Sequence, residues 1–156
     1  MDRRLTPEGR VAASKMGAYL TPSGLMPDLA LVSPARRAIE TLDEIERATA
    51  GAFPSGVIGE LYNASMERLI ALLAATPPKV RVLLVTGHNP GLGETANALT
   101  EEGSADDIAR LRVQFPAPCL AVIGFEAADW SNACRQGGRL DRFITLAALQ
   151  KSGEGA

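Results

Sequence analysis

Residues 80–91 read VRVLLVTGHNPG, and this stretch decides which kind of fold to expect. It is apolar from Val82 to Val85 and rich in β-branched residues, which is typical of a buried strand. A glycine and His88 follow, and a helix is predicted to start at Pro90 with Asn89 as its cap. A buried strand that leads through a short turn into a helix is the building unit of parallel α/β sheets.

The same alternation of strand and helix extends along the chain in both directions. Helices are predicted over residues 7–20, over 34–48 and from Ser65 to the break at 77–78. Further apolar strands are predicted, with loops between them: strands at 29–32, 120–125 and 140–146, and loops at 51–59 and 100–107. We therefore expect an α/β fold of three layers, with a mostly parallel sheet flanked by helices. Residues 1–150 are expected to form a single domain and residues 151–156 a flexible tail.

The composition excludes several classes of protein. With 156 residues, 46% of them hydrophobic, and a net charge of −2, the chain is suited to a globular domain and not to a disordered one. It has no apolar run of membrane-spanning length, and its pI near 5.5 argues against nucleic acid as a partner. Two cysteines and one histidine make a structural zinc site improbable, and a reduced, cytoplasmic setting is expected.

The first candidate site follows the predicted strand at 29–32, where open α/β sheets bind their ligands. Arg36 and Arg37 stand in the first turn of a helix, where the helix dipole disfavours cations by about 0.3–1 kcal/mol each. A bound anion would reverse that cost, so we expect an oxyanion or phosphate site here that includes Ser33. The alternatives are that the arginines face solvent or pair with Glu40, and that Ser33 is a cap or, with less support, a nucleophile.

The second candidate site is the turn after the strand that is predicted at residues 80–85. His88 directly follows that strand, and Gly87 lets a ligand approach the backbone closely. The position favours a functional histidine, with Asn89 beside it, over one that only caps or packs.

Four segments together resemble the histidine phosphatase superfamily. Ser33-Pro34-Ala35-Arg36-Arg37-Ala38, followed by Thr41, resembles its Ser-Pro-x-x-Arg-Ala-x-x-Thr signature, and Gly87-His88-Asn89-Pro90-Gly91 resembles its second histidine motif. Residues 3–9 resemble a segment of the small phosphohistidine phosphatase branch, and residues 61–64 the connector between the motifs. The resemblance covers nearly the whole chain, with the motifs in the expected order.

This resemblance implies both a fold and a function. The superfamily has a mostly parallel sheet flanked by helices, and its members hydrolyse or transfer phosphoryl groups through a phosphorylated histidine. Arg37 and His88 would then be catalytic, and Ser33, Arg36, Gly87 and Asn89 would bind substrate. The implied substrate is a phosphorylated protein, through its phosphohistidine, or a small phosphomonoester, with no metal or cofactor. A phosphoglycerate-mutase-like phosphotransferase is the alternative activity.

One departure from the superfamily is severe. The nucleophilic histidine belongs to an Arg-His motif at the end of a first strand, which would lie before Met1 and is absent here. His88 is the only histidine and cannot take both roles. The sequence is therefore expected to be N-terminally truncated, so that the full-length protein is active and this chain is not. The alternatives are an inactive phosphate or phosphoprotein binding module and a fragment that folds poorly.

A smaller departure lies in the connector. Some branches place an acidic residue there, whereas this chain has Asn63, with Glu60 nearby. The small phosphohistidine phosphatase branch often lacks that acid, which agrees with a leaving group that needs little protonation.

Overall fold

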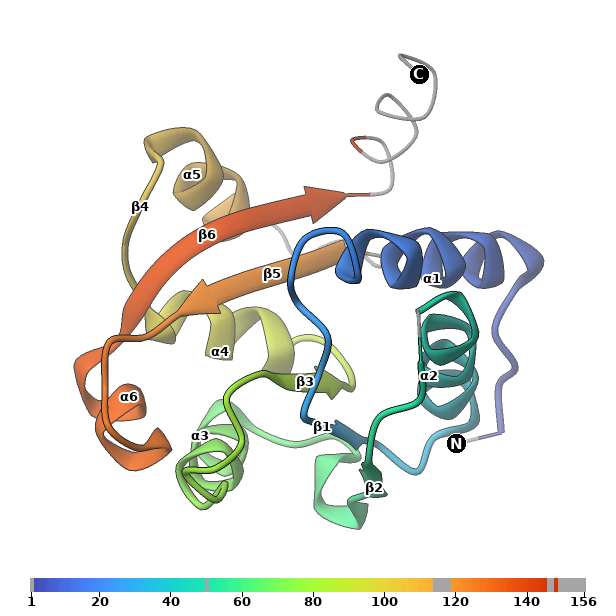
Figure 1. The fold of residues 1–156 in the computed structure, drawn as a ribbon, viewed down its shortest axis with the longest axis horizontal. Helices are drawn as coiled ribbons and strands as arrows, with labels where there is room; N and C mark the ends of the chain where they lie inside the picture. Colours follow the sequence, from blue (N-terminus) through green and yellow to red (C-terminus); the bar gives the residue numbers. More distant parts are fainter. Residues whose placement is uncertain (1, 50, 114–118, 146–147, 149–156) are drawn as a thin grey trace. The chain divides into compact units, whose positions relative to one another are not determined.

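A computed structural model describes residues 2–49, 51–113, 119–145 and 148 of the chain (Figure 1). The chain divides into two compact units, one formed by the segments up to Tyr62 and from Val80 to His88, the other by Asn63–Lys79 and the segment from Asn89 onward. The boundary falls between His88 and Asn89, inside the predicted histidine motif. Within the described residues, no helix is both long enough and apolar enough to cross a membrane.

The first unit is a parallel three-stranded sheet with two long helices. Its strands run in the order β2-β1-β3, and both pairings are parallel. Its elements are α1 (Pro7–Leu20), β1 (Leu29–Val32), α2 (Arg36–Ala48), β2 (Ser55–Val57), the 3-10 helix η1 (Gly59–Leu61) and β3 (Leu83–Thr86). The sequence missed β2, a strand of three residues inside the predicted loop 51–59, because so short a segment carries no periodic pattern.

Helices α1 and α2 lie side by side in this unit (Figure 1). Thr6 caps α1 by accepting a hydrogen bond from the Gly9 N–H at 3.0 Å, which confirms the predicted start of that helix. Gly17 permits the close approach of the two helices, since a Cβ there would collide with the carbonyl oxygen of Ile45. The buried apolar side chains of the two helices are Ala12, Ala13, Met16, Leu20, Ala38, Leu42 and Ile45.

Strand β3 is aligned with β1 over its whole length, from the pair Leu29–Leu83 to the pair Val32–Thr86. The carboxylate of Asp28 accepts hydrogen bonds from the backbone N–H groups of Arg81 and Val82, at 2.8 and 2.9 Å. This clamp holds the entrance of β3, and its backbone hydrogen bonds lower the pKa of Asp28. The parallel register therefore brings the carboxyl ends of β1 and β3 to the same edge of the sheet.

The second unit combines a three-stranded sheet with four helices. The strands run in the order β4-β6-β5, with β4 parallel and β5 antiparallel to β6. Its elements are α3 (Met66–Ala74), α4 (Gly91–Leu99), β4 (Thr100–Gly103), α5 (Ala105–Val113), β5 (Cys119–Gly124), α6 (Trp130–Gln136) and β6 (Gly138–Thr145). Its core cluster joins α4, α5 and β6 through Ala96, Leu111, Leu140 and Phe143.

The mostly parallel α/β class is confirmed, with two differences. Residues 100–107, predicted as a loop, contain β4 and the start of α5, because their Glu and Asp side chains hide the strand pattern. Strands β5 and β6 are antiparallel neighbours, although in the sequence α6 comes between the end of β5 and the start of β6 (Figure 1). Helix α6 packs on α3, so the chain turns back instead of crossing over the sheet. The predicted tail 151–156 lies outside the described residues.

Candidate functional site

The ends of β1 and β3 meet at a hydrogen bond between two side chains. Ser33 follows β1 and His88 follows β3 by two residues, and Ser33 Oγ lies 2.7 Å from His88 Nε2. The backbone fixes this approach, because the Ser33 N–H donates to the carbonyl oxygen of Thr86 at 3.1 Å. Ser33 is fully buried and His88 is half-buried. The parallel pairing thus joins two residues that are 55 positions apart in the sequence.

Arg37 reaches the same histidine from the first turn of α2. Its Nη2 lies 3.4 Å from His88 Nδ1, and the residue is exposed. In the described part of the chain, no carboxylate forms an ion pair with Arg37. The site therefore presents a guanidinium whose charge is not neutralised, which is what an anionic ligand requires.

Arg36 has a different environment. Its Nε donates to Glu40 Oε1 at 3.2 Å, one turn further along α2. Glu40 also accepts from the Leu5 N–H at 2.7 Å and pairs with Arg10 at 3.1 Å. The Leu5 hydrogen bond is the main reason why the pKa of Glu40 is lowered, followed by the charge of Arg10 and then the contact with Arg36. The structure does not bring Arg36 to His88, and its predicted role in substrate binding remains a prediction.

The start of α2 adds backbone donors near this point. Ala35 is the N-cap residue and its side chain makes no capping hydrogen bond. The Ala35 N–H itself donates to Ser33 Oγ at 3.3 Å. The first turn of a helix has N–H groups without intrahelical partners, and here no cap side chain occupies them. Backbone N–H groups and a guanidinium thus converge beside His88, an arrangement suited to a phosphoryl group.

His88 is held in the neutral state by its surroundings. Burial lowers its pKa, and the charge of Arg37 lowers it further. The ring of Tyr62, just after η1, packs edge-on against the imidazole with the centroids 5.6 Å apart. In the sequence, Tyr62 is part of the connector at residues 61–64, and no feature of the sequence predicted its contact with His88.

Asn89 and Gly91 lie at the start of α4, in the second unit, where they stabilise its first turn and allow a close backbone contact. The predicted start of this helix at Pro90, with Asn89 as cap, is wrong by one residue, since the helix begins at Gly91 and its N-cap residue is Pro90. Asn89 still satisfies one donor of the first turn, because its Oδ1 accepts from the Gly93 N–H at 3.3 Å. A Cβ at Gly91 would collide with the carbonyl oxygen of Ala64, which explains the glycine there. The Asn89–Pro90 peptide bond is cis. The predicted contacts of Asn89 and Gly87 with substrate stay predictions.

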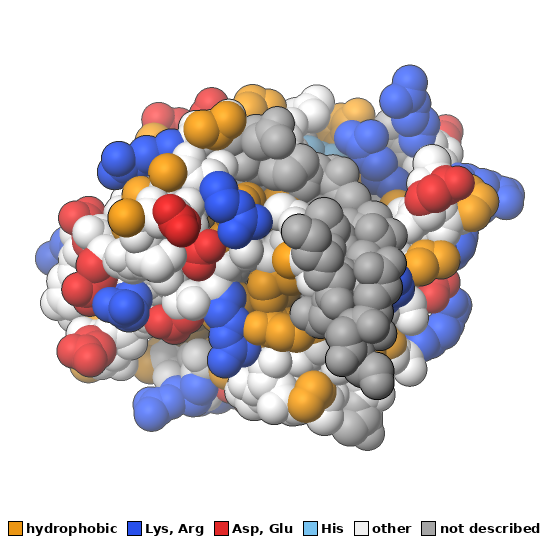
Figure 2. All heavy atoms as spheres, turned by 90° about the horizontal axis from the view of Figure 1, so that it is seen from above, with side chains coloured by type: hydrophobic (Ala, Val, Ile, Leu, Met, Phe, Trp, Pro, Cys, Tyr) orange, Lys and Arg blue, Asp and Glu red, His pale blue; other side chains and the backbone are white. Residues whose placement is uncertain are grey.

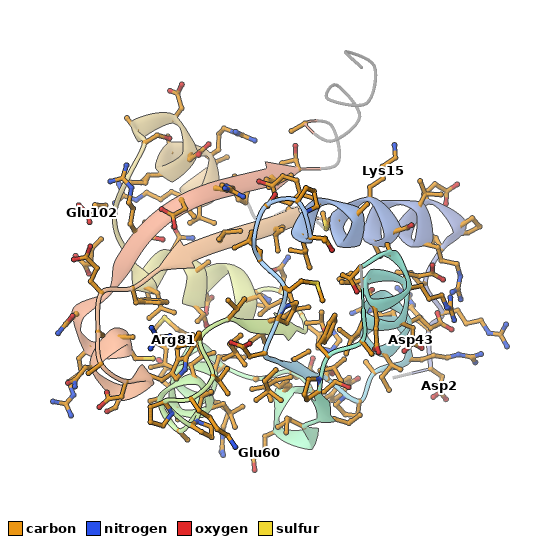
Figure 3. The ribbon with its side chains drawn as sticks, in the orientation of Figure 1. Asp2, Lys15, Asp43, Glu60, Arg81 and Glu102 are labelled. Atoms are coloured by element: carbon orange, nitrogen blue, oxygen red, sulfur yellow. The ribbon has the colours of Figure 1, made fainter. Side chains whose placement is uncertain are left out.

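Three further side chains with reactive groups are those of Glu60, Cys119 and Cys134. Glu60 is exposed, and Figure 3 shows its side chain on η1, pointing away from β1. Burial raises the pKa of Cys119 to about 12 and also raises that of Cys134, so neither thiol is activated. Among the described residues no cluster of three or more His, Cys, Asp or Glu side chains could hold a metal ion. On the face shown in Figure 2, acidic and basic side chains are interspersed.

The sequence did not single out Thr86, the last residue of β3. Its side chain is buried, and its hydroxyl has no hydrogen-bond partner within the described part of the molecule. Such a hydroxyl is unusual in a folded protein and calls for an explanation. The available signal was a polar residue at the end of an apolar strand.

Comparison with known proteins gives relatives that match most of the chain. No family model matches the sequence. An uncharacterised protein of Mycobacterium leprae is 32% identical over 132 residues, which cover 84% of this chain and 79% of that protein. An uncharacterised protein of Mycobacterium tuberculosis is 29% identical over 133 residues, covering 84% of this chain and 81% of its own.

Three solved structures share the fold. A SixA protein from Agrobacterium tumefaciens, assigned as a phosphohistidine phosphatase, is 30% identical with a TM-score of 0.75, covering 92% of this chain and 84% of that one. One from Nakamurella multipartitia, with the same assignment, is 27% identical with a TM-score of 0.78, covering 92% and 85%. The protein histidine phosphatase SixA in complex with tungstate shares the fold at 22% identity, with a TM-score of 0.74 and coverages of 95% and 87%.

Proposed function

The chain belongs to the histidine phosphatase superfamily, with SixA-type proteins among its relatives, and on this premise we propose that it carries the phosphoryl-binding part of a phosphohistidine phosphatase site. One observation carries the proposal. The guanidinium of Arg37 meets the imidazole of His88 at 3.4 Å, from a helix start that has no capping side chain. The substrate class is a phosphorylated protein, through its phosphohistidine, or a related small phosphoester.

The two side chains suit the charge of a phosphoryl group. Arg37 offers several N–H donors in a planar fork that matches phosphate oxygens. His88 is neutral without a ligand because burial and Arg37 lower its pKa. A dianion between the two groups would offset that effect, so His88 would take up a proton and donate to a second oxygen. Both charges would then stabilise the three equatorial oxygens as the group is transferred.

The nucleophile must come from elsewhere, since the 156 residues contain one histidine. We assign it to a histidine on a further strand that pairs with β3. Strand β3 is an edge of its sheet. The Thr86 carbonyl bonds to β1, so by alternation the peptide groups of Leu83 and Val85 face the open edge. The buried hydroxyl of Thr86, the last residue of β3, has no hydrogen-bond partner among the described residues. A parallel strand on this edge would end beside His88.

The phosphoryl group would then be transferred and hydrolysed in two steps. The added histidine would attack phosphorus, and the phosphorus–nitrogen bond of the substrate would break, with the imidazole as leaving group. Water would next hydrolyse the phosphorylated histidine and release inorganic phosphate. Imidazole leaves readily from phosphorus, which agrees with Asn63 in the connector and with the exposed, outward position of Glu60.

The binding half of this proposal is testable on the chain as it is. Isothermal titration of inorganic phosphate at low salt should show binding to the wild type. Arg37→Ala should weaken it about 10- to 100-fold, from the loss of a charge-assisted contact of about 1.5–3 kcal/mol. Arg47→Ala, in the last turn of the same helix, is the matched control and should change the affinity by less than about threefold, because Arg47 pairs with Glu44 away from the helix start. Equal losses in both variants, or no binding by the wild type, would overturn it.

Catalysis is tested on a longer protein. If the reading frame upstream encodes a strand with an Arg-His motif, the extended protein should release phosphate from a phosphohistidine peptide. The 156-residue chain should not. If no such strand exists, the second function that the single histidine favours is a non-catalytic phosphate or phosphoprotein binding module. That module predicts the same Arg37 dependence of binding without turnover.

A further inference from the structure

The ring of His88 has a hydrogen-bond partner at each nitrogen. Nε2 lies 2.7 Å from Ser33 Oγ, and Nδ1 lies 3.4 Å from Arg37 Nη2. A neutral imidazole carries one N–H and one lone pair, so it must donate at one nitrogen and accept at the other. The two partners together therefore determine which nitrogen holds the proton.

Arg37 settles this assignment. A guanidinium only donates hydrogen bonds and has no acceptor atom. The contact with Arg37 thus requires the lone pair on Nδ1, which leaves the proton on Nε2. The Nε2–H then donates to Ser33 Oγ, which also accepts from the Ala35 N–H at 3.3 Å. Two acceptor positions of one hydroxyl oxygen are used in this way, one by the ring of His88 after β3 and one by the Ala35 backbone N–H just after β1.

We infer that Ser33 is a positioning residue, which accepts the Nε2 proton of His88 and so presents Nδ1 to Arg37. The second part of the inference rests on the proposed function. When an anion binds at Arg37, Nδ1 takes up a proton and donates to the anion, while Nε2–H remains on Ser33. Ser33 thus acts on the ligand only through the histidine ring.

This assignment separates two chemistries that the sequence left open. If Ser33 donated its proton to Nε2, the pair would resemble the activated serine of a hydrolase. In the tautomer that Arg37 requires, Nε2 has no lone pair and cannot accept the serine proton. Ser33 is also fully buried, so its oxygen does not face solvent. Ser33 therefore orients His88 and is not a nucleophile.

The chain offers a direct test because His88 is its only histidine. Long-range proton–nitrogen NMR on the ¹⁵N-labelled chain, at a pH where the ring is neutral, should give one pair of ring nitrogens. We expect the protonated type of ¹⁵N shift at Nε2 and the unprotonated type at Nδ1. The opposite assignment, with the proton on Nδ1, would overturn the inference.

Variants show which partner causes the preference. Arg37→Ala, at an exposed position, should give averaged shifts for both nitrogens, whereas the control Arg36→Ala should leave the wild-type pattern. Ser33→Ala removes the acceptor of the Nε2 proton and should move both shifts part of the way towards the average, because only Arg37 then favours this tautomer. Ser33→Thr should restore the wild-type pattern because the hydroxyl is kept. An unchanged pattern in both Arg37→Ala and Ser33→Ala would overturn the inference, since the ring would then choose its tautomer without them.

Titration with sodium sulfate separates this inference from the proposed function. Sulfate should move the Nδ1 shift to the protonated type and leave Nε2 unchanged, and both effects should be lost in Arg37→Ala. If the free chain has the Nε2 tautomer but sulfate causes no change, the anion site fails while the role of Ser33 stands. If sulfate moves Nε2 instead, the assignment of Nδ1 to the anion is wrong.

Discussion

Arg37 Nη2 and His88 Nδ1 lie 3.4 Å apart, although 51 positions separate the two residues in the sequence. Arg37 is always cationic, and His88 becomes cationic when its ring takes up a second proton. The charge of Arg37 therefore opposes this protonation. Burial of the ring acts in the same direction. The pair is thus poised to change charge when an anion arrives, and its energetics can be followed at a single titrating residue.

The pKa of His88 should rise when Arg37 is replaced by Gln, because one of the effects that lower this pKa is removed while burial of the ring remains. An NMR titration of the single histidine measures this directly. The free energy of unfolding should respond too. The unfolded chain binds a proton near pH 6.5 and the folded chain only below that, so the stability from His88 is full above about 6.5 and declines as the pH falls. Arg37→Gln should reduce that decline, and an unchanged or lower pKa would contradict the account.

Sulfate affinity should increase as the pH falls from about 8 to about 5, because sulfate keeps its charge while His88 gains one on binding. Coupling to one proton limits the slope to about tenfold per pH unit. Calorimetry in two buffers of different ionisation enthalpy would detect the proton uptake. His88→Gln should remove the pH dependence, whereas Arg36→Ala should retain it. A slope that survives in His88→Gln would assign the proton to another group.

Gly91→Ala should destabilise the second unit by about 1–3 kcal/mol, because the new Cβ would collide with the backbone carbonyl of Ala64. Urea unfolding followed by circular dichroism measures the change. Gly59→Ala is a suitable control, since a Cβ at Gly59 meets no atom within 4 Å. Similar losses in both variants would show that the effect comes from the substitution type and not from the contact with Ala64.

Thr86→Val should leave the free energy of unfolding unchanged or raise it, because the hydroxyl that it removes is buried and has no partner in the part of the chain that the structure describes. Thr95→Val is the matched comparison. Thr95 is also buried, but its hydroxyl donates to the Gly91 carbonyl at 2.7 Å, so its loss should cost about 0.5–1.5 kcal/mol. In an upstream-extended protein with a strand on β3, Thr86→Val should become destabilising. A large loss already in the 156-residue chain would contradict the unpartnered hydroxyl.

Several elements were predictable because their signals are local. The hydroxyls of Thr6 and Ser65 each accept a hydrogen bond from the N–H group three residues further along, at 3.0 and 3.2 Å. The signal for the start of each helix therefore lies within four consecutive residues. The apolar run before His88 likewise predicted β3. Strands β2 and β4 were not predicted, because they are stabilised by pairing with β1 and β6, which are distant in the sequence.

The sequence by itself determined the chemistry available at two strand ends: serine and two arginines after β1, and one histidine after β3. Position in the first turn of a helix did not tell Arg36 from Arg37, and only the resemblance to the superfamily assigned the catalytic role to Arg37. Their difference depends on Glu40, which Leu5 and Arg10 hold in place from another segment, and on the parallel register that brings β3 alongside β1. Only the tertiary structure therefore decided that Arg37 faces His88 and that Ser33 holds its Nε2, because side-chain partners are set by contacts between segments distant in the sequence.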